Sequence, residues 1–143
     1  NDWESSLTHD DFKTSDKVKI KTCKIDSLIK NYELNNFILF IKLDIEGNEM
    51  NALQGALKTV EELSPIIIIE FSKFIFDNKV NIDYMNNFLN NFNYQIYDTK
   101  KKEINMEEII FRISKLTKRH KTIGNYYLLK KNSNQLEMFK KND

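Results

Sequence analysis

Residues 37–43 form an apolar run that ends abruptly in acidic side chains, and this feature most constrains the fold. Apart from Lys42, every position in the run is apolar, which is typical of a strand covered by helices on both faces. Three carboxylates surround a glycine directly after it: Asp44, Glu46, Gly47 and Glu49. Because open α/β sheets bind ligands at the carboxyl ends of such strands, we expect a functional site at this position.

A helix and a second strand follow the acidic segment. Asn48 is a candidate N-cap, and Glu49 complements the helix dipole from the first turn. Four apolar residues recur at helical spacing and predict one buried stripe: Met50, Leu53, Leu57 and Val60. Pro65 ends the helix, and the apolar run at residues 66–71 predicts a strand with Glu70 near its end. Strand, helix and strand within about thirty residues predict a βαβ unit with a right-handed crossover.

Asp44 and Glu46 are the leading candidates for catalytic chemistry. They lie two residues apart where the strand gives way to a loop, so both side chains can face one crevice. A carboxylate there can accept a proton from a substrate hydroxyl, or bind a hydroxyl or a cation. The alternative is that Asp44 only satisfies the backbone amides that open the helix. Three like charges crowded around one glycine favour the functional interpretation, because one carboxylate would suffice for the structure.

Gly47 and Glu70 complete the candidate site as residues of the substrate pocket. Gly47 is expected to adopt a positive φ or to let the backbone approach a ligand closely. Glu70 ends the second strand beside the first, so it either faces the same crevice or is a solvated strand end. Glu49 is interpreted as a helix-start residue rather than as a site residue.

The rest of the chain predicts one α/β domain. Asp26 is a candidate N-cap for a short helix. Further elements are expected from the apolar periodicity: helices over about residues 82–91 and 106–116, and strands over residues 94–97 and 125–129. We therefore expect a single domain at residues 1–131 and a polar, frayed or partly docked tail at residues 132–143.

Composition excludes several functional classes. The 22 basic and 21 acidic side chains nearly cancel, so charge favours neither nucleic acid nor an anionic membrane as a partner. No apolar stretch approaches the ~20 residues that span a bilayer, and the first residues lack a secretion signal, so a cytoplasmic location is expected. His9 and His120 have no partners at metal-ligand spacing, so no metal is expected on them. Cys23, the single cysteine, allows no intramolecular disulfide and is expected to be a small core residue.

Several segments, in order, resemble the FkbM-type methyltransferases: IDSL at residues 25–28, DIEGNE at 44–49, LQGA at 53–56, PIIIIE at 65–70 and NYYLL at 125–129. The similarity covers most of residues 3–130. It implies S-adenosylmethionine as cofactor and the class I methyltransferase fold, a Rossmann-like α/β sheet whose last strand is antiparallel. The chain resembles the carboxyl-terminal part of that fold, strands four to seven with the helices between them.

The cofactor loop of that family is a glycine-rich turn that lies well before the DxEGxE segment. The chain has only three glycines, and none of them forms a G-x-G pair: Gly47, Gly55 and Gly124. We therefore expect an incomplete methyltransferase chain that binds S-adenosylmethionine poorly by itself.

The reaction implied by the resemblance is methyl transfer to a hydroxyl oxygen of a small-molecule or glycan acceptor, such as a sugar or a hydroxylated natural product. Asp44 would lie nearest the acceptor and orient or deprotonate it, and Glu46 would shape the same pocket. Ser5 and Ser6 would line the cofactor side. No metal is required for this reaction.

Two other classes of function remain open. The first is a non-catalytic remnant or interaction module that associates with itself or a partner through an exposed sheet edge. The second is a metal-dependent hydrolase that uses Asp44, Glu46 and Glu70, which predicts tight binding of Mg²⁺ or Mn²⁺.

Overall fold

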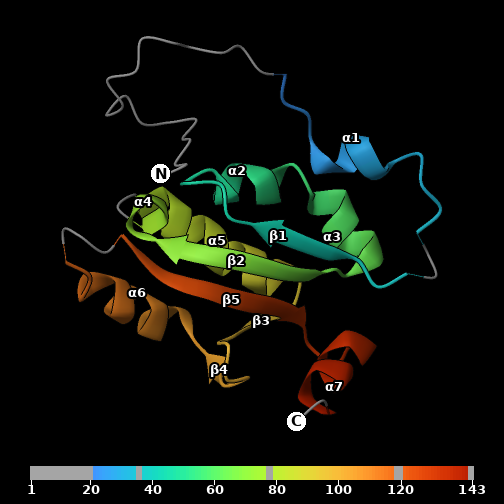
Figure 1. The fold of residues 1–143 in the computed structure, drawn as a ribbon. Helices are drawn as coiled ribbons and strands as arrows, with labels where there is room; N and C mark the ends of the chain where they lie inside the picture. The colour runs from blue at the N-terminus through green and yellow to red at the C-terminus, as the bar shows by residue number, and fades with distance from the viewer. Residues whose placement is uncertain (1–20, 35–36, 77–78, 118–120, 142–143) are drawn as a thin grey trace, which may run out of the picture.

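A mixed five-stranded sheet with the strand order β1-β2-β5-β3-β4 organises the protein (Figure 1). The computed structural model describes residues 21–34, 37–76, 79–117 and 121–141. The strands are β1 (Phe40–Leu43), β2 (Ile66–Ser72), β3 (Tyr94–Tyr97), β4 (Glu103–Ile104) and β5 (Thr122–Lys130). The helices are α1 (Ile25–Ile29), α2 (Glu49–Gln54), α3 (Leu57–Leu63), α4 (Lys73–Phe76), α5 (Lys79–Asn91), α6 (Met106–Ser114) and α7 (Asn134–Lys141).

The predicted βαβ unit is present: β1 and β2 pair in parallel, from Phe40 opposite Ile66 to Leu43 opposite Ile69. The final strand, β5, lies between β2 and β3 and is antiparallel to both. The expected α/β class is thus confirmed as a mixed sheet, and its arrangement is compatible with a Rossmann-like fold.

Strand β1 differs from the prediction in length and in burial. It begins at Phe40 instead of Phe37, and the Phe40 side chain is 60% exposed. The reason is that side chains alternate along the strand: Ile41 and Leu43 pack in the larger core, whereas Phe40 points to the opposite face, where the described core contains no residue of β1. The expectation that helices cover both faces of this strand is therefore wrong for the described part of the chain.

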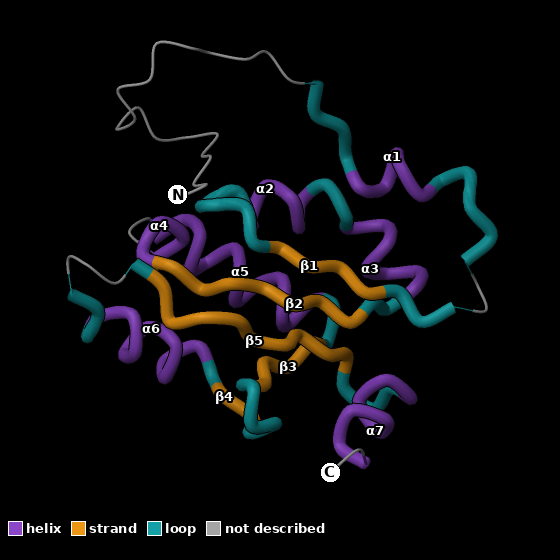
Figure 2. The backbone as a smooth tube through the Cα atoms, in the orientation of Figure 1, coloured by secondary structure: helices purple, strands orange, loops and turns teal. Residues whose placement is uncertain are grey.

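The two faces of the sheet are covered unequally. The larger core lies on one face, where alternate strand residues Ile67, Ile69 and Phe71 pack with apolar side chains of α2, α3, α5 and α6. On the other face, Ile66 and Leu129 pack with Leu136 of α7. Figure 2 shows α7 beside the end of β5, apart from the other helices. The tail at residues 132–143 thus includes a docked helix.

The single helix predicted after Asn48 is two helices, α2 and α3, which meet at Gly55 and Ala56. Asp26 supplies the missing cap: its Oδ1 accepts hydrogen bonds from the Thr59 backbone N–H at 2.9 Å and the Thr59 hydroxyl at 2.6 Å. Its Oδ2 accepts one from the Lys58 N–H at 3.2 Å. Asp26 was predicted to cap its own helix, but it lies inside α1 and caps α3 instead.

Two smaller expectations also differ from the structure. Cys23 is exposed instead of buried, because it lies in an irregular segment before α1. The short elements α4 and β4 were not predicted, since neither is long enough to show a hydrophobic period. Among the described residues, no helix has the length and apolar character needed to span a membrane.

Candidate functional site

The carboxyl ends of β1 and β2 lie side by side at one edge of the sheet (Figure 1). Leu43 is opposite Ile69, so the next position along each strand places Asp44 beside Glu70. Asp44, Glu46 and Glu70 each contribute a carboxylate oxygen, and these oxygens all lie within 4.8 Å of one another. The structure therefore brings together the three acidic residues selected from the sequence.

A tight loop directs Glu46 toward the other carboxylates. Glu46 has a φ of 52° and Gly47 has a φ of 97°, so the chain passes through two successive left-handed residues. The positive φ expected at Gly47 is confirmed. A non-glycine residue in this region costs about 1–2 kcal/mol, so the backbone at Glu46 is held in place by its surroundings.

Glu49 is the residue that the sequence interpretation underestimated. It begins α2 as expected, but its side chain is only 1% exposed. The Ile45 backbone N–H donates to its Oε1 at 3.0 Å, which ties the loop back to the helix. Its Oε2 has no hydrogen-bond partner in the described part of the chain. The sequence contained one signal that Glu49 has a further role, namely the crowding of acidic residues in this segment. A residue that only begins a helix does not explain that crowding.

The environment of Glu49 disfavours negative charge. Burial raises the pKa of its carboxyl group, and the charge of Glu46 raises it further. Hydrogen bonds from the amides of Ile45, Gly47 and Glu49 itself lower the pKa but do not cancel the rise.

Glu70 experiences the same crowding. Its pKa is raised mainly by burial and also by the charges of Asp44, Glu46 and Glu49, while a hydrogen bond from the Thr122 side chain opposes the rise. Asp44 is more accessible, with its side chain 36% exposed, and it forms an ion pair with Lys42 on the same face of β1. The site thus combines one accessible carboxylate with acidic groups that are progressively more buried.

A second feature at the same edge of the sheet is a hollow of about 450 Å³. Because β5 is antiparallel to β2, its first residues lie near the carboxyl end of β2, and Asn125 is directly opposite Glu70. Eight residues line the hollow: Asp98, Thr99, Lys100, Arg112, Ile123, Gly124, Asn125 and Tyr126. Its volume lies within the range of small-molecule sites.

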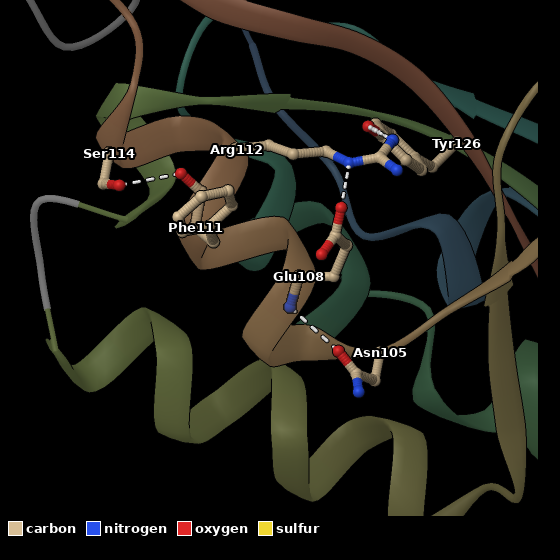
Figure 3. A network of polar contacts seen from close by, with 6 residues as sticks. All are labelled: Asn105, Glu108, Phe111, Arg112, Ser114 and Tyr126. Carbon is tan, nitrogen blue, oxygen red and sulfur yellow. Dashed lines mark hydrogen bonds and ion pairs between the residues drawn. The ribbon is translucent and has the colours of Figure 1, made fainter.

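Arg112 is one of the residues that line this hollow. Its polar contacts with Glu108 and Tyr126 hold the guanidinium in place (Figure 3). Its Nε donates to Glu108 Oε1 at 2.9 Å, and its Nη1 donates to the Tyr126 hydroxyl oxygen at 3.1 Å. Asn105 caps the same helix by accepting from the Glu108 N–H at 2.8 Å. Sequence reasoning missed Arg112, because its position inside an amphipathic helix carries no signal of a site.

Ser5 and Ser6, assigned to the cofactor side, lie outside the described residues, as do His9 and His120. The described residues fit only part of S-adenosylmethionine. The carboxylates can face a sulfonium or ammonium cation, but Gly47, Gly55 and Gly124 are too far apart in sequence to form a glycine-rich turn.

Comparison with known protein families identifies a domain family for this chain. The model of the Methyltransferase FkbM domain matches residues 1–96, about two-thirds of the 143 residues. The matched range contains the whole acidic site, whereas α6 and β5 lie beyond it. Neither the curated proteins nor the solved structures contain a match.

Proposed function

Because the chain belongs to the FkbM methyltransferase domain family, we propose that it acts in methyl transfer from S-adenosylmethionine to a hydroxyl oxygen of a small-molecule or glycan acceptor. The observation that supports this proposal best is the convergence of Asp44, Glu46 and Glu70 at adjacent strand ends inside the matched range. A carboxylate at this place can accept the proton that a hydroxyl must lose when it is methylated.

The strand arrangement supports a class I methyltransferase sheet. In this assignment β1, β2, β3 and β5 correspond to strands four, five, six and seven of that fold. The position of β5 between β2 and β3, antiparallel to both, agrees with the reversed last strand. The described residues would then form the acceptor side of the site, with Ser5 and Ser6 proposed on the cofactor side.

The reaction requires alignment first and base assistance second. When bound, S-adenosylmethionine would supply an electrophilic methyl group to the acceptor oxygen and would leave as a neutral thioether. Asp44 accepts the hydroxyl proton, since it is the most accessible carboxylate of the cluster. Glu46 and Glu70 accept hydrogen bonds from neighbouring hydroxyls, and the turn at Gly47 leaves room for close approach of the acceptor.

The hollow beside Arg112 is proposed to hold the rest of the acceptor. It lies at the same sheet edge, and its lining includes the guanidinium of Arg112, the carboxylate of Asp98 and the side-chain amide of Asn125. Planar polar groups of this kind can hydrogen-bond several hydroxyls at once. This lining favours a polyhydroxylated acceptor over an apolar one.

The test is a methyltransferase assay on the product of the complete reading frame that encodes this chain. S-adenosylmethionine with a labelled methyl group is incubated with a panel of mono- and oligosaccharides, together with apolar alcohols as comparison acceptors. We expect label in at least one carbohydrate and equimolar S-adenosylhomocysteine. Release of S-adenosylhomocysteine with no labelled product would indicate hydrolysis, and transfer to apolar alcohols alone would contradict the proposed acceptor class.

A second candidate function is self-association through β1. Phe40 lies on this edge strand, and Phe37 lies in the segment that leads into it. Both side chains are highly exposed, as is typical of surfaces that pair with another strand. Light scattering of the wild type and of Phe40→Lys distinguishes this candidate. A dimer that the substitution dissociates would support an interaction module, whereas a concentration-independent monomer would exclude it.

A further inference from the structure

We infer that the hollow beside Arg112 binds an anionic group of the acceptor, a carboxylate or a phosphate, through Arg112 and Lys100. Both side chains line the hollow, whose volume of about 450 Å³ suits a sugar-sized ligand. The carboxylates proposed to act in methyl transfer are not part of this lining. The identification of the ligand as the methyl acceptor rests on the proposed function, whereas the binding of the anion does not.

Arg112 is held in place and is still open to a ligand. Its guanidinium has five N–H donors, and its hydrogen bonds to Glu108 and Tyr126 use two of them. In the described part of the chain the other three have no acceptor, and the side chain is 32% exposed. A guanidinium can bind a carboxylate or a phosphate through two parallel N–H donors, and one that is already oriented loses little freedom on binding.

The charge of Arg112 is maintained by the same contacts. Hydrogen bonds to Glu108 and Tyr126 raise the pKa of the guanidinium above its ordinary value, and burial opposes this rise only in part. The group is therefore a permanent cation at neutral pH.

Lys100 adds a second cation to the lining. Its side chain is exposed, and it forms no ion pair with the described residues. The carboxylate in the lining belongs to Asp98, whose Oδ1 accepts the backbone N–H groups of Lys100 at 2.9 Å and Lys102 at 3.0 Å. Asp98 thus closes its own turn, and the lining has two cations against one carboxylate.

The charge of the chain is segregated in the same sense. Seven basic residues and no acidic one lie between Glu108 and Glu137, the part of the sequence that includes β5. At the neighbouring strand ends, the candidate site is acidic. The two regions adjoin, since Asn125 of the hollow is directly opposite Glu70. An anionic group is repelled by the carboxylates and attracted to the hollow, which would orient the opposite end of the acceptor toward Asp44.

The test is calorimetric titration of the product of the complete reading frame with sodium glucuronate, glucose 6-phosphate and glucose. S-adenosylmethionine is left out, and the ionic strength is held constant. We expect at least one anionic sugar to bind at least about tenfold more tightly than glucose, because charge-assisted hydrogen bonds are roughly twice as strong as neutral ones.

Substitutions locate the site. Arg112→Gln and Lys100→Gln should each remove much of the preference for the anionic sugar, since each removes one cation from the lining. Lys102→Gln is the matched control, because Lys102 is exposed in the same turn but does not line the hollow. It should keep the wild-type preference. Circular dichroism establishes that each variant is folded, and Lys100→Gln, on an exposed turn, decides the result if Arg112→Gln does not fold.

Two results would overturn the inference. The first is a wild type that binds neither anionic sugar more tightly than glucose, including a wild type that binds neither at concentrations up to about 10 mM. The second is an undiminished preference in the folded variants of the lining. Because the titration contains no methyl donor, anion binding without methyl transfer would reject the proposed function alone. Methyl transfer without anion binding would reject only this inference.

Discussion

Asp26 shows how one side chain can connect distant parts of the fold. It lies in α1 but caps α3, through hydrogen bonds to Lys58 and Thr59. The capped hydroxyl of Thr59 belongs to a residue that is only 2% exposed, so loss of Asp26 would leave buried polar groups unsatisfied. This link fixes α1 against the helix pair that follows the acidic loop.

We predict that Asp26→Ala lowers the free energy of unfolding by about 1–2 kcal/mol, the usual cost of losing a helix cap. Urea denaturation measures the loss, and Asp83→Asn on the exposed side of α5 serves as a matched control. Equal stability of Asp26→Ala and the wild type would show that this cap is unimportant.

The same residue predicts a pH dependence. Burial alone would raise the pKa of Asp26, but hydrogen bonds from Thr59 and Lys58 outweigh it and hold the pKa below its ordinary value of 3.8. A lowered folded-state pKa contributes stability above pH 3.8 that is lost as the pH falls through the folded pKa. The stability gap between wild type and Asp26→Ala should therefore narrow below about pH 3.8 in thermal melts. A gap that stays constant would contradict this assignment.

At the scale of elements, the junction between α2 and α3 depends on local geometry more than on a requirement for glycine. Gly55 has a φ of −79°, which any residue can adopt, and an added Cβ would approach the Ala52 carbonyl oxygen no closer than 3.4 Å. Gly124 differs, because its φ of +89° lies in the region that side chains disfavour.

A matched pair of substitutions tests this contrast. Gly55→Ala should raise the free energy of unfolding by about 0.5–1 kcal/mol, since it restricts the unfolded chain without strain. Gly124→Ala should lower it by about 1–2 kcal/mol through backbone strain, although there is open space for the methyl group. Denaturant titration measures both changes, and destabilisation by both would show that the α2–α3 junction also requires glycine.

Helix α7 provides a second element-scale prediction. Leu136 is 7% exposed and packs in the smaller core, whereas Met138 on the same helix is 50% exposed. Leu136→Ala should cost about 2–3 kcal/mol of stability, as for other buried leucines, and Met138→Ala less than about 0.5 kcal/mol. Equal effects in thermal melts would mean that α7 does not dock on the sheet in solution.

At the scale of the whole molecule, local sequence patterns predicted the elements better than their partners. The apolar run and the acidic loop correctly predicted the βαβ unit, because strand period and turn residues are local signals. The insertion of β5 between β2 and β3 depends on pairing between distant segments, which no local pattern encodes.

The candidate site, like the fold, could be predicted from the sequence only in part. Asp44 and Glu70 come together because neighbouring parallel strands end at one edge of a sheet, a rule that follows from strand direction alone. The burial of Glu49 and the position of Arg112 depend on tertiary packing, so neither could be derived from spacing. The hollow beside Arg112 likewise combines residues from α6, β5 and the segment after β3.

The most direct measurement of the central claim compares wild type and Asp44→Asn in the methyltransferase assay, using the product of the complete reading frame. Asparagine keeps the size and much of the hydrogen bonding of aspartate but cannot accept the acceptor's proton, so we predict a rate at least about 100-fold lower. Melting temperature and S-adenosylmethionine affinity should stay close to wild type, and Glu62→Gln should retain full activity. A folded Asp44→Asn variant that transfers methyl groups at the wild-type rate would contradict the role of Asp44 and the location of the site.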